Sequence, residues 1–134
     1  MLRSGRAIPM VTASALALLT LAVFWFLRES GPESAVRKFH IAVVNGDTAV
    51  LEDLLAAGSS RYATSYLVAV VANYARAGAQ FRIHGTARGT EATFVEVDYV
   101  VPRRTPVPVL WATMKQGGRW RIHPDLTLRT SLER

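Results

Sequence analysis

The sequence predicts an α+β protein in which an N-terminal transmembrane helix precedes about three helices packed on a curved antiparallel sheet of about four strands. Three observations predict this class. The run from Ala7 to Leu27 has no charged residue and is long enough to cross a bilayer. Apolar residues then recur at helical intervals as far as Tyr74. From Gln80 onward they alternate with polar residues, which is the period of a strand.

The uncharged run comprises 21 residues between Arg6 and Arg28. At about 1.5 Å of rise per residue it would span roughly 30 Å as a helix, which is the thickness of the hydrocarbon core of a bilayer. Trp25, close to Arg28, has the amphipathic ring that favours a membrane interface. The residues of this predicted span include Ala7, Leu16, Leu19, Val23, Trp25 and Leu27.

A cleaved signal peptide is the alternative, because Arg3 and Arg6 form a basic segment ahead of the run. A signal h-region has only about 7–15 residues and is followed by small residues at alternate positions, whereas this run leads into Leu27-Arg28-Glu29. We therefore expect an uncleaved anchor, with the N-terminus inside and the domain on the periplasmic side of a bacterial-type inner membrane. The predicted organisation is a tail over 1–6, a transmembrane helix over 7–28 and one domain over 29–134.

The composition narrows the class of function. The net charge is +6, and the excess of basic residues lies after Ala75, where the sequence has ten Arg or Lys residues and five acidic ones. This charge suits anionic headgroups or an acidic partner, and we expect no nucleic acid for a chain tethered to a membrane. No cysteine is present, which excludes disulfides and thiolate metal sites.

Capping residues mark the predicted helices. Ser30 and Glu33 have the spacing of a capping box and predict a first helix that ends at Asn45-Gly46. Asp47 caps a second, shorter helix closed by Gly58. A serine, at position 59 or 60, caps a third that stops at Ala77-Gly78.

The strands follow as a meander. Residues 80–88 alternate, and a longer strand of mixed faces follows the turn at Gly89-Thr90. A third strand is expected around Val109 to Lys115, and a double-glycine turn leads into a fourth at Arg119 to His123. Pro124 interrupts that last strand, although apolar residues beyond it offer an extension.

Three short segments support a family resemblance. They are Asn45-Gly46-Asp47, the strand after Ala87-Arg88-Gly89, and Gly117-Gly118-Arg119-Trp120-Arg121-Ile122 in the final hairpin. With the order of elements from Pro32 to Leu128, they make the chain resemble the nuclear transport factor 2-like superfamily. The resemblance implies a cone-shaped α+β domain. It leaves function open, because some members resemble enzymes with an acid or base inside the cone and anchored members resemble assembly subunits of type IV secretion systems.

The anchored layout favours a role without catalysis. We expect an accessory or scaffolding subunit that stabilises a larger membrane protein complex, whose partners are the lipid bilayer and other subunits of that complex. Candidate contacts are the small residues Ala13 and Ala17 in the span and the pair Arg103 and Arg104, which prolines stiffen. A solvated hairpin tip that protects the sheet edge is the simpler interpretation of the two arginines.

The alternative is a pocket-bearing domain of the same fold that binds or transforms a small apolar ligand. Its candidate pocket residues are His40, Tyr62, Tyr66, Glu96 and Asp98. A surface ion-pair ladder with the basic residues at 82, 84 and 88 is the preferred interpretation of the two acids. We expect no cofactor and no metal, because the three histidines lie far apart in the sequence.

Overall fold

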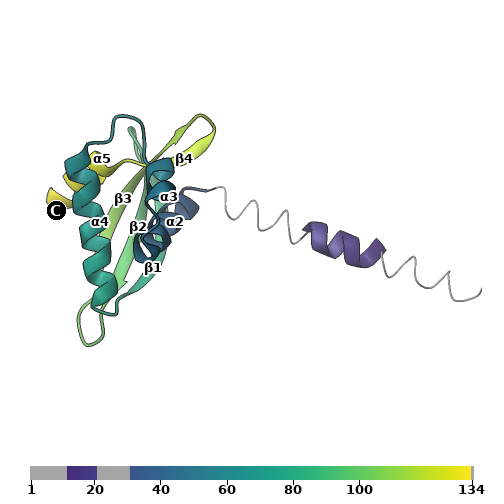
Figure 1. Cartoon of the computed structure of the whole chain (residues 1–134), viewed down its shortest axis with the longest axis horizontal. Coiled ribbons are helices and arrows are strands. Elements are labelled where there is room, and N and C mark those ends of the chain that lie inside the picture. Colours follow the sequence, from purple (N-terminus) through teal and green to yellow (C-terminus); the bar gives the residue numbers. More distant parts are fainter. Residues whose placement is uncertain (1–11, 21–30, 134) are drawn as a thin grey trace, which may run out of the picture. The chain divides into compact units, whose positions relative to one another are not determined.

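The computed structural model describes residues 12–20 and 31–133. The chain divides into two units, Met1–Ser30 and Gly31–Arg134, which are described separately (Figure 1). In the first unit, residues 12–20 are helical and exposed, and Thr20 Oγ1 donates a hydrogen bond to the carbonyl oxygen of Leu16. Leu19 and the two alanines at positions 13 and 17 also lie in this helix.

The prediction of a membrane span is contradicted. Among the described residues, no helix is both long and apolar enough to cross a membrane. Residues 12–20 are helical, and the neighbouring residues 7–11 and 21–27 of the predicted span lie outside the part of the chain that the structure describes. The predicted span residues Ala7, Val23, Trp25 and Leu27 lie outside the described residues. The predicted inner-membrane localisation depended on this span and is contradicted together with it. A run of uncharged residues does not by itself determine that the chain forms a helix long enough to cross a membrane.

The second unit is an α+β domain with one four-stranded antiparallel sheet in the order β1-β2-β3-β4. This arrangement is compatible with a nuclear transport factor 2-like fold. In chain order its elements are α2 (Pro32–Asn45), α3 (Thr48–Leu54), α4 (Arg61–Arg76), β1 (Gln80–Arg88), β2 (Thr93–Val100), β3 (Val107–Gln116), β4 (Arg119–Ile122) and α5 (Pro124–Leu132).

Local capping chemistry sets the helix ends. Gly46 ends α2 in the left-handed conformation, at a φ of 67° that suits glycine. The side chain of Asp47 then accepts a hydrogen bond from the backbone N–H of Val50, and that of Ser60 accepts one from Ala63, so both predicted caps are confirmed. The N-cap of α2 is Gly31 rather than Ser30, which lies outside the described residues.

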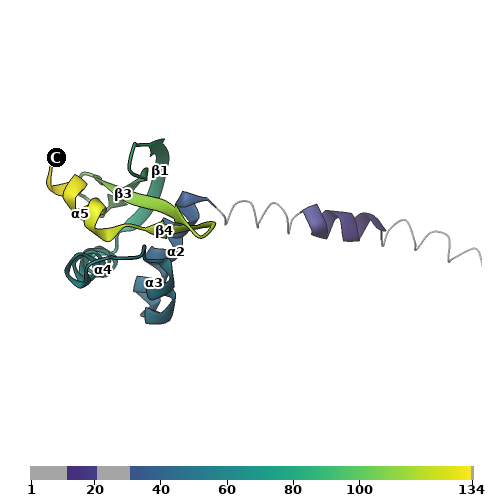
Figure 2. The same ribbon diagram turned by 90° about the horizontal axis from the view of Figure 1, so that it is seen from above.

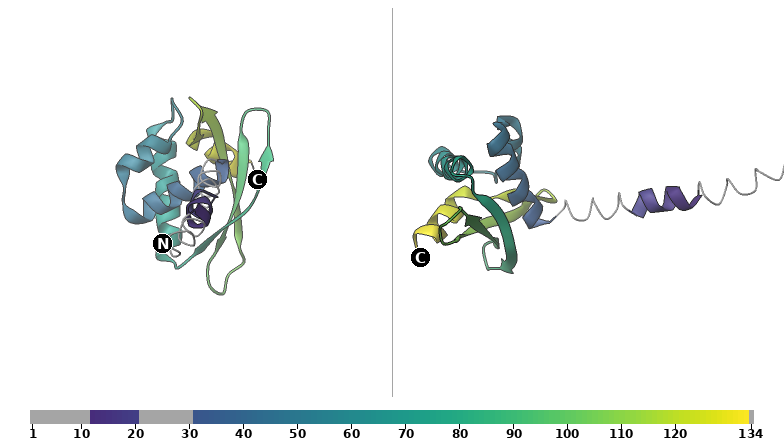
Figure 3. Two further views of the ribbon diagram at one scale, coloured as in Figure 1. Left: turned by 90° about the vertical axis from the view of Figure 1, so that its right-hand side faces the viewer. Right: turned by 90° about the horizontal axis from the view of Figure 1, so that it is seen from below.

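The core lies between one face of the sheet and the helices α2, α3 and α4. Figures 2 and 3 show α3 and α4 on one side of the sheet. Alternate residues of β2, from Val95 to Tyr99, point into this core, as the strand period requires. The fully or nearly fully buried side chains of the core are Val36, Phe39, Val71, Val95, Val97, Tyr99, Trp111 and Ile122.

The segment after β4 is a helix, not the extension of the strand that the apolar residues suggested. His123 is its N-cap, and its Nδ1 accepts a hydrogen bond from the backbone N–H of Leu126. Pro124 takes the first helical position, where its missing N–H is tolerated. The Thr127 hydroxyl donates to the His123 carbonyl and accepts from the backbone N–H of Ala112 on β3. The start of α5 thereby supplies hydrogen-bond partners for the backbone of β3 at Ala112, beyond the end of β4.

Candidate functional site

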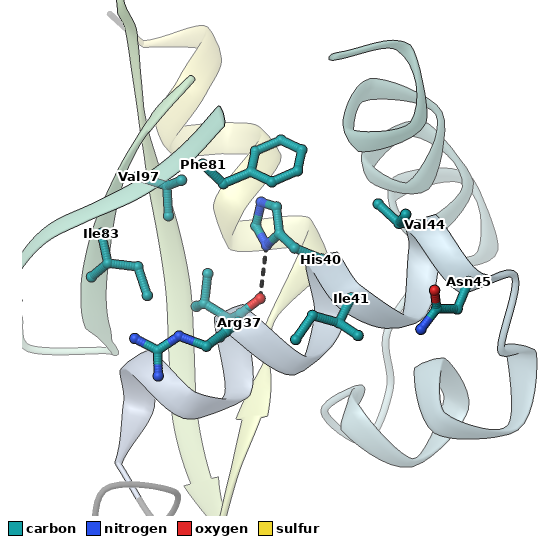
Figure 4. A pocket seen from close by; sticks show the side chains of 9 residues that line it. Arg37, His40, Ile41, Val44, Asn45, Phe81, Ile83 and Val97 are labelled. Carbon is teal, nitrogen blue, oxygen red and sulfur yellow. Dashed lines mark hydrogen bonds between the residues drawn. The ribbon is translucent and has the colours of Figure 1, made fainter. Parts of the chain in front are cut away.

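A pocket of about 460 Å³ lies between α2 and the strands β1 and β2 (Figure 4). Six of its nine lining residues are aliphatic or aromatic hydrocarbons, and none is acidic. The lining comprises Val36, Arg37, His40, Ile41, Val44, Asn45, Phe81, Ile83 and Val97. This volume is within the range of roughly 300–1,000 Å³ that is typical of small-molecule sites.

The periods of the three elements bring these residues together. On α2 the lining residues recur at three- and four-residue spacing, which places them along one side of the helix. Phe81 and Ile83 are alternate residues of β1 and share a face, and Ile83 pairs directly with Val97 of β2. Both Ile41 and Val44 are more than half exposed, so the apolar lining continues to the surface of the domain.

A buried hydrogen-bond network connects His40, a residue of the pocket lining, to Tyr99 and Trp111 in the core. The Trp111 indole N–H donates to the hydroxyl oxygen of Tyr99 over 2.9 Å. His40 Nε2 lies 2.7 Å from that oxygen, and His40 Nδ1 lies 2.7 Å from the carbonyl oxygen of Val36. Because a carbonyl only accepts, Nδ1 carries the proton, and the Tyr99 hydroxyl donates to Nε2. Every polar atom of the histidine ring therefore has a partner.

Burial fixes the protonation state of this network. Desolvation lowers the pKa of His40 to about 4, against the smaller opposing effect of its hydrogen bond to Val36. Desolvation likewise raises the pKa of Tyr99 well above its ordinary value of about 10. Both side chains are therefore neutral near pH 7, and the network carries no net charge.

Aromatic contacts hold the same residues in place. The centroid of the His40 ring lies 4.9 Å from that of Phe81 and 4.9 Å from that of Trp111. Tyr74 of α4 stacks on Tyr99 with a centroid separation of 4.5 Å. Such pairs add about 0.5–1.5 kcal/mol each beyond the area that they bury. His40 is thus packed between aromatic rings on the side of the pocket that adjoins the core.

Arg37 is the only lining residue that is charged at neutral pH, since His40 is neutral. Its side chain is exposed, and Figure 4 shows the guanidinium group on the Ile83 side of the pocket. The ion pairs between described residues are His84 with Asp98 and Arg119 with Asp53, and neither involves Arg37. The guanidinium is therefore available to an anion at the pocket mouth.

Of the five pocket candidates from the sequence, His40 lines the pocket and the other four lie elsewhere. Tyr62 and Tyr66 are exposed on α4 and stack on each other, with ring centroids 6.5 Å apart. Glu96 and Asp98 alternate with the buried residues of β2 and so point to the opposite face of the sheet.

The ion-pair ladder expected along β1 is present in part. His84 Nδ1 lies 3.4 Å from a carboxylate oxygen of Asp98, and Arg82 stands directly opposite Asp98 in the strand register. Arg88 stands opposite Thr93, on the other face of the sheet. No described residue forms an ion pair with Glu96.

The two candidate contact arginines lie in the loop between β2 and β3. Both Arg103 and Arg104 are exposed, and the backbone N–H of Arg104 donates to the carbonyl of Val101. Arg103 has a φ of 65°, the left-handed region that a residue with a side chain rarely adopts. The loop therefore holds a strained arginine at its tip.

Three residues of the candidate site were not identified from the sequence: Arg37, which lines the pocket, and Tyr99 and Trp111, which form the hydrogen-bond network with His40. Arg37 stands one turn before Ile41 on α2, and its charge at the border of an apolar stripe was the available signal. Tyr99 is separated from His40 by 59 positions, so only the packing of α2 on β2 brings the two together.

The described residues contain no group of three or more His, Cys, Asp or Glu side chains that could hold a metal ion. Comparison of the chain with protein-family models, with curated proteins and with solved structures found no match. The site is therefore interpreted from its own geometry.

Proposed function

We propose that the unit Gly31–Arg134 is a binding domain of the nuclear transport factor 2-like type, and that its α2–β1–β2 pocket holds a small apolar ligand. The observation that supports this most is the pocket itself, about 460 Å³ with a mainly apolar lining. His40 in this lining is held by hydrogen bonds to Val36 and Tyr99, so little ordering entropy of that side chain is lost when a ligand enters.

The lining supports binding rather than chemistry. General acid–base catalysis needs a group that exchanges a proton with the substrate. Neither ring nitrogen of His40 is free, because one donates to Val36 and the other accepts from Tyr99. The acids Glu96 and Asp98 lie on the other face of the sheet. We therefore propose a domain that holds its ligand without transforming it.

Filling the pocket tests this proposal. The variant Ile83→Trp places a large ring in the pocket lining. We expect it to weaken the binding of two neutral probes at least about tenfold, because about 1.4 kcal/mol of lost contact energy gives that factor. The probes are the dye Nile red and 1-decanol, which displaces the dye from the pocket. Fluorescence titration measures both affinities. The matched control is Val107→Trp, an exposed position on β3 outside the lining, which should leave them unchanged. Equal affinities of the folded Ile83→Trp variant and the wild type would refute the assignment of the pocket.

A second function is favoured by the conformation of Arg103. We propose that the β2–β3 loop binds an acidic surface of a protein partner, so that the domain acts as an accessory subunit of a larger complex. Residues held at positive φ cost about 1–3 kcal/mol and cluster at functional sites. Pro102 and Pro106 flank the arginine pair and reduce the entropy that the loop loses on docking.

Charge reversal tests this second function. The double variant Arg103→Glu with Arg104→Glu should reduce the amount of partner that co-purifies with the tagged protein by about tenfold or more, because two attractive contacts become repulsive. The double variant Arg88→Glu with Lys115→Glu changes the net charge equally at exposed sites on the strands and should retain the partner. Equal loss with both pairs would show a general charge effect and would contradict a specific contact at the loop.

A further inference from the structure

We propose that the ligand of the α2–β1–β2 pocket is a single-chain amphiphile with an anionic head, whose carboxylate pairs with Arg37 while its hydrocarbon chain occupies the pocket. This inference rests on the proposed function, namely that the pocket binds a small apolar ligand. It adds the chemical class of the ligand and the residue that selects it.

The charge distribution of the lining points to an anion. The guanidinium of Arg37 lines the pocket, and no acidic residue does. Glu33 lies one helical turn before Arg37 on α2 but forms no ion pair with it among the described contacts. An exposed ion pair at this spacing is weak, because water and salt screen both charges. A ligand carboxylate, which can accept two parallel N–H bonds from a guanidinium, therefore meets little competition.

The inner end of the pocket requires the rest of the ligand to be apolar. Both ring nitrogens of His40 have partners inside the protein, and the Tyr99 hydroxyl is used by two neighbours. A hydroxyl or carbonyl placed there would lose its hydrogen bonds to water without replacement, which disfavours binding. A hydrocarbon chain against Phe81 and Ile83 carries no such penalty.

The position of Arg37 places the head at one end of the site. Asn45, the only other polar lining residue apart from His40, lies eight positions further along α2. At about 1.5 Å per residue the two residues are roughly 12 Å apart along the helix axis. Figure 4 shows them on opposite sides of His40, with the apolar side chains of Ile41 and Val44 between them along the helix. The stretch between the two residues suits a hydrocarbon chain, and only the Arg37 end carries a charge that can bind an anionic head.

The test compares decanoate with 1-decanol, which have the same chain length and differ in head group. Nile red displacement is measured on the full chain below the micellar concentration of either compound. We expect decanoate to bind about three- to fivefold more tightly than 1-decanol, the upper range for an ion pair at an exposed arginine. The variant Arg37→Gln should weaken decanoate by the same factor and leave 1-decanol unchanged. Lys38→Gln is the matched control, because Lys38 is the adjacent exposed cation on α2 and is not part of the lining.

The outcomes separate the two proposals. If both compounds bind equally and Arg37→Gln changes neither affinity, the inference is wrong while the proposed binding function stands. If neither compound binds the wild-type chain, the binding function fails and the inference fails with it. If Arg37→Gln and Lys38→Gln weaken decanoate equally, the attraction is a general effect of surface charge and Arg37 selects nothing. Thermal unfolding of each variant verifies that it is folded, as expected for two exposed positions.

Discussion

Replacing Tyr99 with phenylalanine should lower the free energy of unfolding by about 2–4 kcal/mol, although it removes a single oxygen atom. That oxygen accepts from the Trp111 indole N–H and donates to His40 Nε2, and all three side chains are buried. The substitution leaves one donor and one acceptor without partners, at a cost of about 1–3 kcal/mol for each unsatisfied group. Urea unfolding monitored by circular dichroism measures the difference.

Tyr74→Phe is the matched control for this prediction. Tyr74 stacks on Tyr99 at 4.5 Å, but its hydroxyl makes no hydrogen bond to a described residue. We expect its loss to change the free energy of unfolding by less than about 0.5 kcal/mol, as for most substitutions away from buried networks. If the two variants were equally stable, the network of His40, Tyr99 and Trp111 would not exist in solution.

The helix and strand boundaries that depend on local chemistry could be read from the sequence. Asp47 and Ser60 cap their helices through backbone N–H groups only three residues away, and Gly46 supplies the left-handed turn at the end of α2. The four antiparallel strands likewise follow from a period of two residues and from the turns between them. These features need no knowledge of distant residues.

The two errors of fold prediction have a common origin. In both, the hydrophobic character of a short segment was interpreted without knowledge of the tertiary contacts that the segment makes. The lack of charge from Ala7 to Leu27 suggested a transmembrane helix, but no described helix is long and apolar enough to cross a membrane. The segment after Pro124 was interpreted as a broken strand, whereas it is α5. That helix bonds to β3 through Thr127, a contact that becomes visible only once the strands are paired.

The candidate site could be predicted only in part. His40 could be named as a candidate because it lies beside the apolar stripe of the first predicted helix. Its partners were not, since Tyr99 and Trp111 lie on strands far along the chain and reach it through tertiary packing. Placing Glu96 and Asp98 in the pocket required the opposite face of β2 to point inward. The strand register excludes that, because Val95, Val97 and Tyr99 occupy the buried face.

Acidification from pH 7 to pH 4.5 should destabilise the domain by about 2–3 kcal/mol through His40 alone, since a pKa difference of one between the folded and unfolded states is worth about 1.4 kcal/mol. The pKa of His40 is about 4 in the folded protein, against 6.5 as the ordinary value that the unfolded chain approaches. Between these values the unfolded state binds a proton that the folded state does not, so stability is fully present above about pH 6.5 and is lost as the pH falls toward 4. Chemical unfolding at several pH values measures the slope.

The variant His40→Gln separates this contribution from the other titrating groups. Its amide oxygen can accept from the Tyr99 hydroxyl but does not titrate, so its free energy of unfolding should vary much less between pH 7 and pH 4.5 than that of the wild type. Carboxylates such as Asp125, whose pKa is lowered by hydrogen bonds from Ser60, contribute equally to both proteins and cancel in the comparison. A wild-type slope in His40→Gln would mean that His40 binds as many protons in the folded state as in the unfolded state, and the low pKa of His40 and the neutral network would both be wrong.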